Sequence, residues 1–93
     1  MNVGILQVEL FIPHSGSLKS KRHVLRSLKD RIRQRFNVSV SEVDGQDKWQ
    51  RAVLGIACVG CDKPYINGTL SRISDLIEQQ SLAQVTDIQL EIL

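Results

Sequence analysis

The chain contains little of what would place it in several common protein classes. It has only two cysteines and four aromatic residues among 93, which fits an aliphatic interior with reduced thiols rather than a disulfide scaffold. No apolar run approaches the ~20 residues that span a bilayer. The first residues, MNVGILQVELFIP, have neither a basic leader nor a small-residue cleavage site. We therefore expect no signal peptide, no membrane association and a cytoplasmic location.

Strand-like and helix-like hydrophobic patterns follow one another along the chain. Residues 3–12, 37–43 and 83–93 alternate, and residues 49–60 are apolar on both faces, as in a central strand. Apolar residues three or four positions apart indicate one helix from Leu18 and another after Asp62. The order βαββαβ predicts one α+β domain over residues 1–93. Because crossovers are right-handed, we expect a ferredoxin-like fold: a four-stranded antiparallel sheet, strands one and three central, with two helices on one face.

The other face of the predicted sheet is expected to be mixed in character. Its predicted apolar members are Ile5, Phe11, Val53, Val59 and Val85. Its predicted polar members are Gln7, Glu9, Asp87, Gln89 and Glu91. Such a face is either solvated or joins two copies of the chain in a homodimer.

Basic residues are concentrated in one segment. The net charge is only +2, yet residues 18–36 hold eight basic residues and one acid, which gives +7 there and −5 elsewhere. On a helix, five of them fall within a sector about 80° wide and form a cationic ridge about 20 Å long. The cationic ridge consists of Lys19, Arg22, Arg26, Lys29 and Arg33. Lys21 falls on the core-facing side, so we expect its stem along the sheet edge and its ammonium beside the loop after the first strand.

Two interpretations of this basic helix stay open. It is either a solvated surface balanced by the acidic remainder, or a surface that binds RNA phosphates through the ridge and Lys21. On the sheet face, Phe11 and Trp49 are the candidates for stacking on bases, but acidic residues there would repel phosphates: Glu9, Asp87 and Glu91. Trp49 is predicted to cover one end of the core rather than to stack on a ligand. We therefore expect contact through the helix, with recognition of backbone and shape rather than of bases.

The loop PHSGSLKSK leads from a strand into a helix N-terminus, where free amide groups favour an anion. Ser15, Gly16 and Ser17 are the candidate anion-binding residues. Acylphosphatase-type enzymes use this fold and this loop, but they need an arginine in the loop and an asparagine on the third strand. The loop has no arginine and AVLGIACV has no asparagine. We therefore expect no catalytic residues, no cofactor and no enzymatic activity.

The stretch CVGCDKP places Cys58 and Cys61 three positions apart, just before a predicted helix. This spacing suits a redox pair or two ligands of a soft metal such as copper(I). Strand parity, however, places Cys58 on the core face, where a free cysteine behaves as a small hydrophobe. No further cysteine or neighbouring histidine completes a zinc site. A packing role and a thiol-dependent metal carrier are the two alternatives.

The segments GSLKSKRHVLRSLKDRIRQRFNVSVSEV and DKWQRAVLGIACV resemble the YlxP-like family of small bacterial proteins of unknown function, and the likeness covers nearly the whole chain. The resemblance implies a ferredoxin-like fold and a link to translation or ribosome biogenesis through genes often found nearby. It implies no established activity, and the CVGC pair is not part of the family pattern. Together these features predict a non-enzymatic protein that binds RNA or a ribosomal particle through its first helix. A copper-type carrier or a homodimer module is the alternative.

Overall fold

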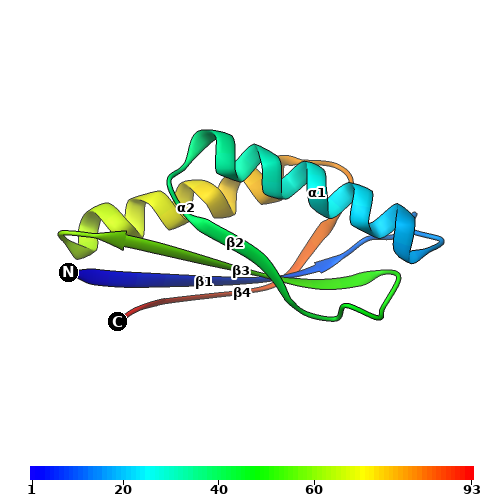
Figure 1. Cartoon of the computed structure of the whole chain (residues 1–93), viewed down its shortest axis with the longest axis horizontal. Coiled ribbons are helices and arrows are strands. Elements are labelled where there is room, and N and C mark those ends of the chain that lie inside the picture. The colour runs from blue at the N-terminus through cyan, green and yellow to red at the C-terminus, as the bar shows by residue number, and fades with distance from the viewer.

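The computed structural model describes all residues from Met1 to Leu93 and confirms the predicted element order. The elements are β1 (Asn2–Phe11), α1 (Leu18–Arg35), β2 (Ser39–Asp44), β3 (Arg51–Gly60), α2 (Lys63–Gln79) and β4 (Gln84–Ile92). The strands form one antiparallel sheet in the order β2-β3-β1-β4, so β1 and β3 are central. Both helices lie on the same face of this sheet (Figure 1). The protein therefore has the ferredoxin-like βαββαβ fold.

Each helix begins at a side chain that caps it. The Ser17 hydroxyl accepts a hydrogen bond from the Ser20 amide at 3.1 Å, and the Asp62 carboxylate accepts one from the Tyr65 amide at 2.7 Å. These bonds satisfy amides that have no partner within the first helical turn. Pro64 lies in the first turn of α2, where its missing N–H costs no intrahelical bond. Neither helix combines the length and the apolar character needed to cross a membrane.

The core lies between the sheet and the two helices, and it consists almost entirely of aliphatic side chains. Its central members are Leu6, Val8 and Leu10 on β1, Leu25, Leu28 and Ile32 on α1, Leu54, Ile56 and Cys58 on β3, and Ile66, Leu70, Ile73 and Ile77 on α2. The spacing of these residues along each element follows the two-residue period of a strand or the 3.6-residue period of a helix. Burial of each large aliphatic side chain stabilises the fold by about 1.5–3 kcal/mol.

Helix α2 packs closely on β1 because Gly4 has no side chain. A Cβ atom on Gly4 would overlap Cγ2 of Ile66 and lie 2.8 Å from Cδ1 of Leu70. Gly68, within α2, meets no such contact, since the nearest atom to a Cβ there is Nη2 of Arg72 at 3.6 Å. The close approach of helix and sheet therefore depends on the glycine in the strand.

A β-bulge between β1 and β4 changes the composition of the open sheet face. Glu9 pairs with Asp87, but the next residue, Leu10, pairs with Val85. Because paired residues on neighbouring strands share a face, Val85 lies with Leu10 against the core. The prediction that Val85 lies on the open face is wrong, since it assumed an alternation without a bulge. Val53 does lie on the open face, yet it is only 3% exposed and adds no apolar surface there.

Candidate nucleic-acid interface

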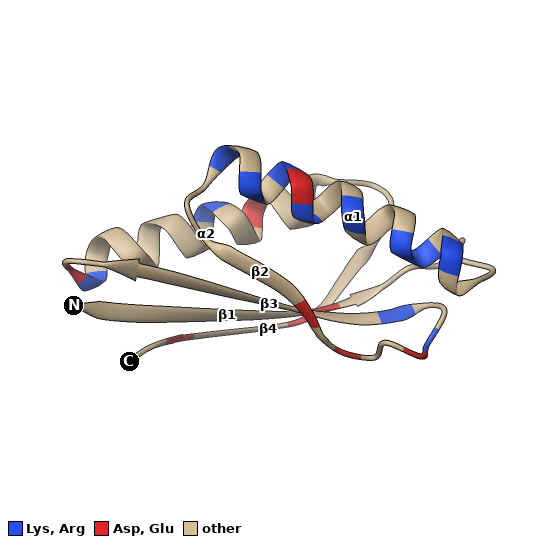
Figure 2. Ribbon diagram, in the orientation of Figure 1, with Lys and Arg blue, Asp and Glu red and all other residues tan.

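The cationic ridge lies along the outer side of α1. Lys19, Arg22, Arg26 and Arg33 are exposed and Lys29 is partly exposed. In Figure 2, basic residues (blue) recur along α1 from its first turn to its last, interrupted by one acidic residue. The ion pairs of the protein include none of Lys19, Arg22, Arg26 and Lys29. Their charges are therefore available to an external anion.

Arg33 is the one member of the ridge that the protein holds in place. Its Nη2 donates a hydrogen bond to the Val40 carbonyl on β2 at 2.9 Å, and its Nη1 lies 4.0 Å from the Asp30 carboxylate. Half of the side chain remains exposed. Arg33 thus ties α1 to β2 while it still presents a positive charge at the C-terminal end of the ridge.

The structure corrects the assignment of Lys21 to the nucleic-acid-binding residues. Its side chain is only 1% exposed, and its ammonium does not emerge beside the loop after β1. Instead Nζ donates hydrogen bonds to the carbonyls of Gly45, Lys48 (2.7 Å) and Arg51 (2.9 Å), around the hairpin between β2 and β3. The Glu42 carboxylate lies 2.9 Å away. All three N–H donors and the charge of Lys21 are thus matched within the protein, and none is left for a phosphate.

The loop between β1 and α1 uses its two hydroxyl groups internally. Ser15 is buried, and its hydroxyl donates a hydrogen bond to the Ser17 carbonyl at 3.1 Å. The Ser17 hydroxyl is occupied as the N-cap of α1. Gly16 is exposed between them. Of the three candidate anion-binding residues, only Gly16 thus faces solvent without a role in holding the loop.

A groove at the end of the sheet brings two exposed aromatic side chains together. We call it the aromatic groove; its volume is about 550 Å³ and its lining residues are Phe11, Ser15, Gly16, Lys48, Trp49, Gln50 and Arg51. Trp49 is 57% exposed and Phe11 is 38% exposed. The prediction that Trp49 covers one end of the core is therefore wrong. The groove could not be predicted from the sequence, because the residues of its two walls are far apart along the chain.

Backbone contacts fix the walls of the aromatic groove. The Ile12 amide donates a hydrogen bond to the Gln50 carbonyl at 2.8 Å, and the Gln50 side-chain amide donates one to the Pro13 carbonyl at 3.2 Å. Lys21 binds the carbonyls on either side of this segment, those of Lys48 and Arg51. The residues on both sides of Trp49 are thus held by α1 and by the segment that follows β1.

Comparison with known proteins identifies the family. The family described as "Protein of unknown function (DUF503)" matches residues 3–90, which include the ridge and the aromatic groove. The chain belongs to the DUF503 family. It is also 40% identical over 76 residues to the protein named "Uncharacterized protein YlxP" of Bacillus subtilis (strain 168), a match that covers 82% of this chain and 83% of that protein. The predicted YlxP-like membership is confirmed.

Beside the aromatic groove of this DUF503 chain, Arg51 is paired with acids on the open sheet face. Its guanidinium lies 2.8 Å from Glu9 and 3.7 Å from Asp44. Arg51 donates two hydrogen bonds to the Glu9 carboxylate, and the Thr86 hydroxyl donates a further one at 3.0 Å. The hydrogen bonds from Arg51 and from Thr86 hold the pKa of Glu9 below its ordinary value, and the bond to Glu9 raises the pKa of Arg51.

We expect the Arg51→Met variant to shift the pKa of Glu9 back toward its ordinary value. Because the folded-state pKa of Glu9 is lowered, its pairing stabilises the fold above the unfolded-state pKa, and this contribution is lost as the pH falls through the folded-state pKa. NMR titration of the Glu9 side-chain carbon, between about pH 2 and 7, measures the shift. A midpoint that stays the same in Arg51→Met would contradict the assigned cause.

The two cysteines of the DUF503 chain lie in different environments. Cys58 is 1% exposed on the core side of β3, whereas Cys61 is exposed after the strand. Burial raises the pKa of the Cys58 thiol and so disfavours the thiolate that a soft metal requires. No group of three or more His, Cys, Asp and Glu side chains is gathered anywhere in the chain. The metal-carrier hypothesis therefore gains no support beyond the spacing of the two residues.

Two basic residues of α1 that are not among the predicted site residues line a cleft between the helices. The cleft has a volume of about 680 Å³, and Arg31 and Arg35 face Gln79 and Gln80 across it. The Gln80 side chain donates hydrogen bonds to the carbonyls of Ile77 and Ala83. Gln80 thus fixes the turn from α2 to β4, and the cleft lies away from the ridge on the other side of α1.

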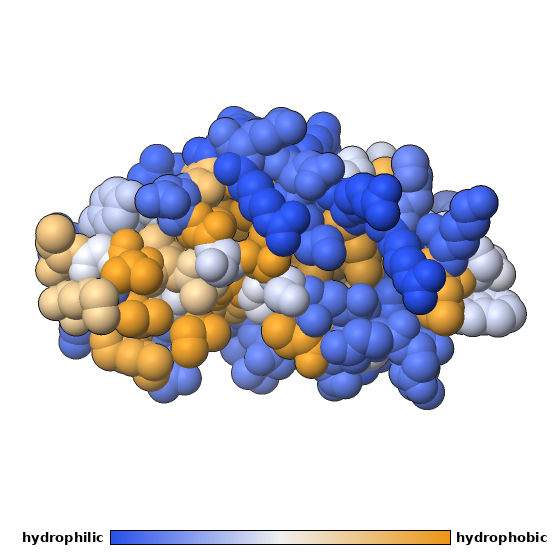
Figure 3. Space-filling model, in the orientation of Figure 1, coloured by the Kyte–Doolittle hydropathy of each residue, from blue (hydrophilic) through white to orange (hydrophobic).

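Exposed apolar side chains gather toward the end of the molecule that holds both chain termini. Figure 3 shows this end in orange, whereas hydrophilic residues cover α1 and the opposite end. On the open sheet face the exposed members are Ile5, Val43 and Val59. Nothing in the structure shows what covers them, and the homodimer remains a prediction.

Proposed function

We propose that this protein is a non-enzymatic, cytoplasmic RNA-binding protein that contacts RNA, or the RNA of a ribosomal particle, through the cationic ridge. The observation that carries the proposal is that Lys19, Arg22, Arg26 and Lys29 lie on one helix face without an ion-pair partner in the protein. An exposed helix ordinarily gains about 0.2–0.5 kcal/mol from each pair of opposite charges three or four positions apart. The four basic residues gain no such stabilisation, and their positive charges repel one another until an anion neutralises them.

The dimensions of the ridge suit a polyanion rather than a single small anion. Lys19 and Arg33 are separated by about 20 Å along the helix axis. Along the axis of a duplex, one strand carries a phosphate about every 3.4 Å, so a ridge of this length extends past several phosphates. Binding would release the counterions that condense on the RNA, and this release is the main driving force for such contacts.

The sheet is poorly suited to the same role. On its open face Asp87 and Glu91 of β4 are exposed. Both side chains are negatively charged and would repel a phosphate. The ridge and the open sheet face lie on opposite sides of the molecule, because both helices cover the other face of the sheet (Figure 1). RNA is therefore expected to approach from the side of α1.

We expect affinity for ribosomal RNA fragments to fall steeply with salt, and the Arg22→Gln/Arg26→Gln variant to bind more weakly with a shallower dependence. Each phosphate contact contributes about −0.7 to −0.9 to the slope of log affinity against log salt, so loss of two contacts should flatten the slope by about 1.4–1.8. Fluorescence anisotropy of a labelled RNA across a salt series measures both quantities. Both arginines are exposed, so the fold should be unaffected.

The matched control is Lys63→Gln/Arg72→Gln. It removes the same charge from exposed positions on α2, so its slope should equal that of the wild type. An equal loss in both variants would assign binding to net charge rather than to the ridge. Absence of binding by the wild type at low salt would overturn the proposed function.

A further inference from the structure

Trp49 is exposed on a segment whose neighbouring backbone groups are hydrogen-bonded to the rest of the fold. More than half of its side chain faces solvent, which leaves a large aromatic surface in water instead of in the core. Lys21 binds the carbonyls of Lys48, which precedes Trp49, and of Arg51, two residues after it at the start of β3. A ligand that stacks on Trp49 would therefore meet a pre-ordered surface and lose little affinity to the ordering of the hairpin.

The aromatic groove has the size and the chemistry of a site for a flat ring. Its volume of about 550 Å³ lies within the range of small-molecule sites. Phe11 supplies a second exposed aromatic side chain from β1. Ser15, Gly16 and Gln50 add polar groups to the rim. Aromatic platforms of this kind hold the bases of single-stranded nucleic acids, because every base has a flat face that can stack.

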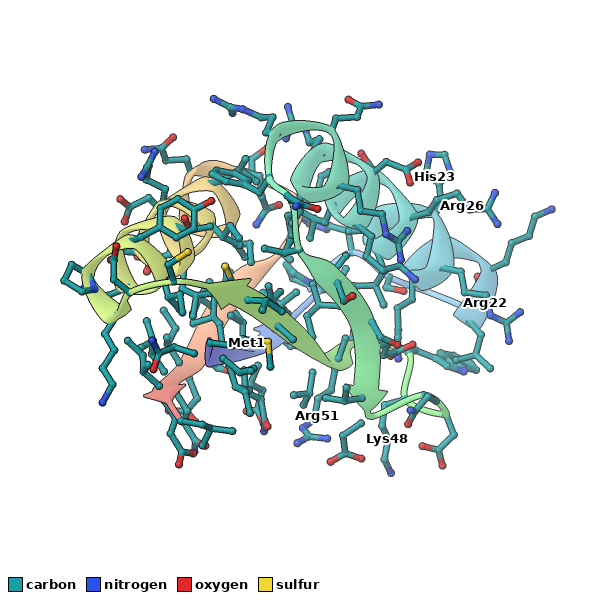
Figure 4. The ribbon with its side chains drawn as sticks, turned by 60° about the vertical axis from the view of Figure 1, so that its left-hand side comes forward. Met1, Arg22, His23, Arg26, Lys48 and Arg51 are labelled. Atoms are coloured by element: carbon teal, nitrogen blue, oxygen red, sulfur yellow. The ribbon has the colours of Figure 1, made fainter.

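The groove adjoins the N-terminal end of the cationic ridge. Lys21 lies on α1 between Lys19 and Arg22, and it touches the same hairpin that carries Trp49. In Figure 4, Arg22 extends from the first turns of α1 and Lys48 extends from the hairpin, both on the side away from Met1. No ion pair involves Lys48. Lys48 is thus the one basic side chain of the groove without an ion pair, and it stands beside the exposed carboxylate of Asp47.

We propose that the aromatic groove receives an unpaired base of the RNA, stacked on Trp49, and that the protein consequently prefers single-stranded RNA to duplex RNA. This inference rests on the proposed function, since the ridge supplies the phosphate contacts that bring the strand to the groove. The bases of a duplex are stacked on one another and cannot enter. The RNA strand runs from the cationic ridge over the end of the molecule that carries the hairpin between β2 and β3, with Lys48 beside the RNA backbone.

The single tryptophan makes the proposal directly measurable. Trp49 is the only tryptophan in the chain, so its fluorescence reports on the groove alone. A labelled oligoadenylate of about eight nucleotides, within the range of known single-strand sites, is titrated against the protein. Anisotropy of the label reports binding, and quenching of Trp49 reports stacking. A blunt-ended RNA duplex, in which every base is paired, is the duplex probe.

We expect Trp49 fluorescence to be quenched in step with binding of the oligoadenylate. The Trp49→Ala variant should bind it about 5- to 150-fold more weakly, which corresponds to the loss of one stacked base. Its salt slope and its affinity for the duplex should be unchanged, because no phosphate contact is removed. Trp49→Phe should retain most of the affinity. Tyr65→Ala is the control, since Tyr65 is 54% exposed in the first turn of α2. The start of α2 and the β2–β3 hairpin lie at opposite ends of the molecule (Figure 1).

The possible outcomes separate the two proposals. Salt-dependent binding without quenching, and with unchanged affinity in Trp49→Ala, would overturn base stacking and keep the ridge. Equal loss of single-stranded and duplex binding in Trp49→Ala would also overturn it. Quenching by free adenosine monophosphate without binding of the oligoadenylate would assign the groove to a mononucleotide and reject the RNA assignment. No binding of either RNA would overturn both proposals.

Discussion

The Lys21→Met variant should lose about 3–5 kcal/mol of unfolding free energy, the cost of breaking a buried ion pair by removal of one partner. Methionine preserves the apolar stem but removes the ammonium. The carbonyls of Gly45, Lys48 and Arg51 then lose their donor, and Glu42 is left with no positive charge beside it. Because domains of this size are stable by only about 5–15 kcal/mol, the variant should be close to unfolding at moderate temperature.

Urea denaturation followed by circular dichroism measures this loss, with Lys29→Met and Lys19→Met as matched controls. Both control residues lie on the same helix, and neither takes part in an ion pair within the protein, so their effects should stay within about 0.5 kcal/mol. The double variant Lys21→Met/Glu42→Met should recover part of the loss, because it removes the unpaired carboxylate. A Lys21→Met protein within about 1 kcal/mol of the wild type would contradict the role assigned to this lysine.

The Gly4→Ala variant should destabilise the fold by about 1–3 kcal/mol, the usual cost of an added methyl group in a packed core. The new Cβ would overlap Ile66 and crowd Leu70, and both of these side chains are fully buried. Neither can move outward without opening the contact between α2 and β1. The helix must therefore shift away from the sheet or the side chains must leave their preferred rotamers.

A double-mutant cycle tests whether this contact is the cause. Ile66→Ala alone should cost about 2–5 kcal/mol, but in the presence of Gly4→Ala the combined loss should be smaller than the sum, because the alanine at position 66 makes room for the new methyl group. Gly68→Ala is the matched control and should stabilise the protein by up to about 1 kcal/mol, since that position is open and alanine favours a helix. Strictly additive losses at Gly4 and Ile66 would contradict the packing account.

Elements whose two sides differ in polarity could be predicted from the pattern of their residues. Leu6, Val8 and Leu10 alternate with other residues, and all three are fully buried. The helix caps Ser17 and Asp62 could be predicted because capping depends on a side chain and an amide three positions away. In β4 the predicted alternation is wrong at Val85, because a β-bulge shifts the pairing there. A bulge depends on how a strand pairs with its neighbour and has no regular sequence pattern.

Only the part of the candidate site that lies on a single helix could be predicted from the sequence. The ridge follows from the spacing of Lys19, Arg22 and Arg26 along one helix, whose geometry is the same in any context. The aromatic groove joins Phe11 at the end of β1 to Trp49 before β3, and their proximity depends on the pairing of two strands. A solitary tryptophan beside a strand fits a core position equally well, which is why its exposure was not foreseen.

The element order, the faces of the helices, the ferredoxin-like fold and the concentration of charge on α1 follow from the amino-acid sequence. These properties depend on residues a few positions apart, for which the backbone geometry alone sets which side chains share a face. The burial of Lys21 and the exposure of Trp49 depend instead on contacts between distant segments. The carbonyl partners of Lys21 lie 24, 27 and 30 positions away, and only the folded chain brings groups at such separations within the reach of a hydrogen bond.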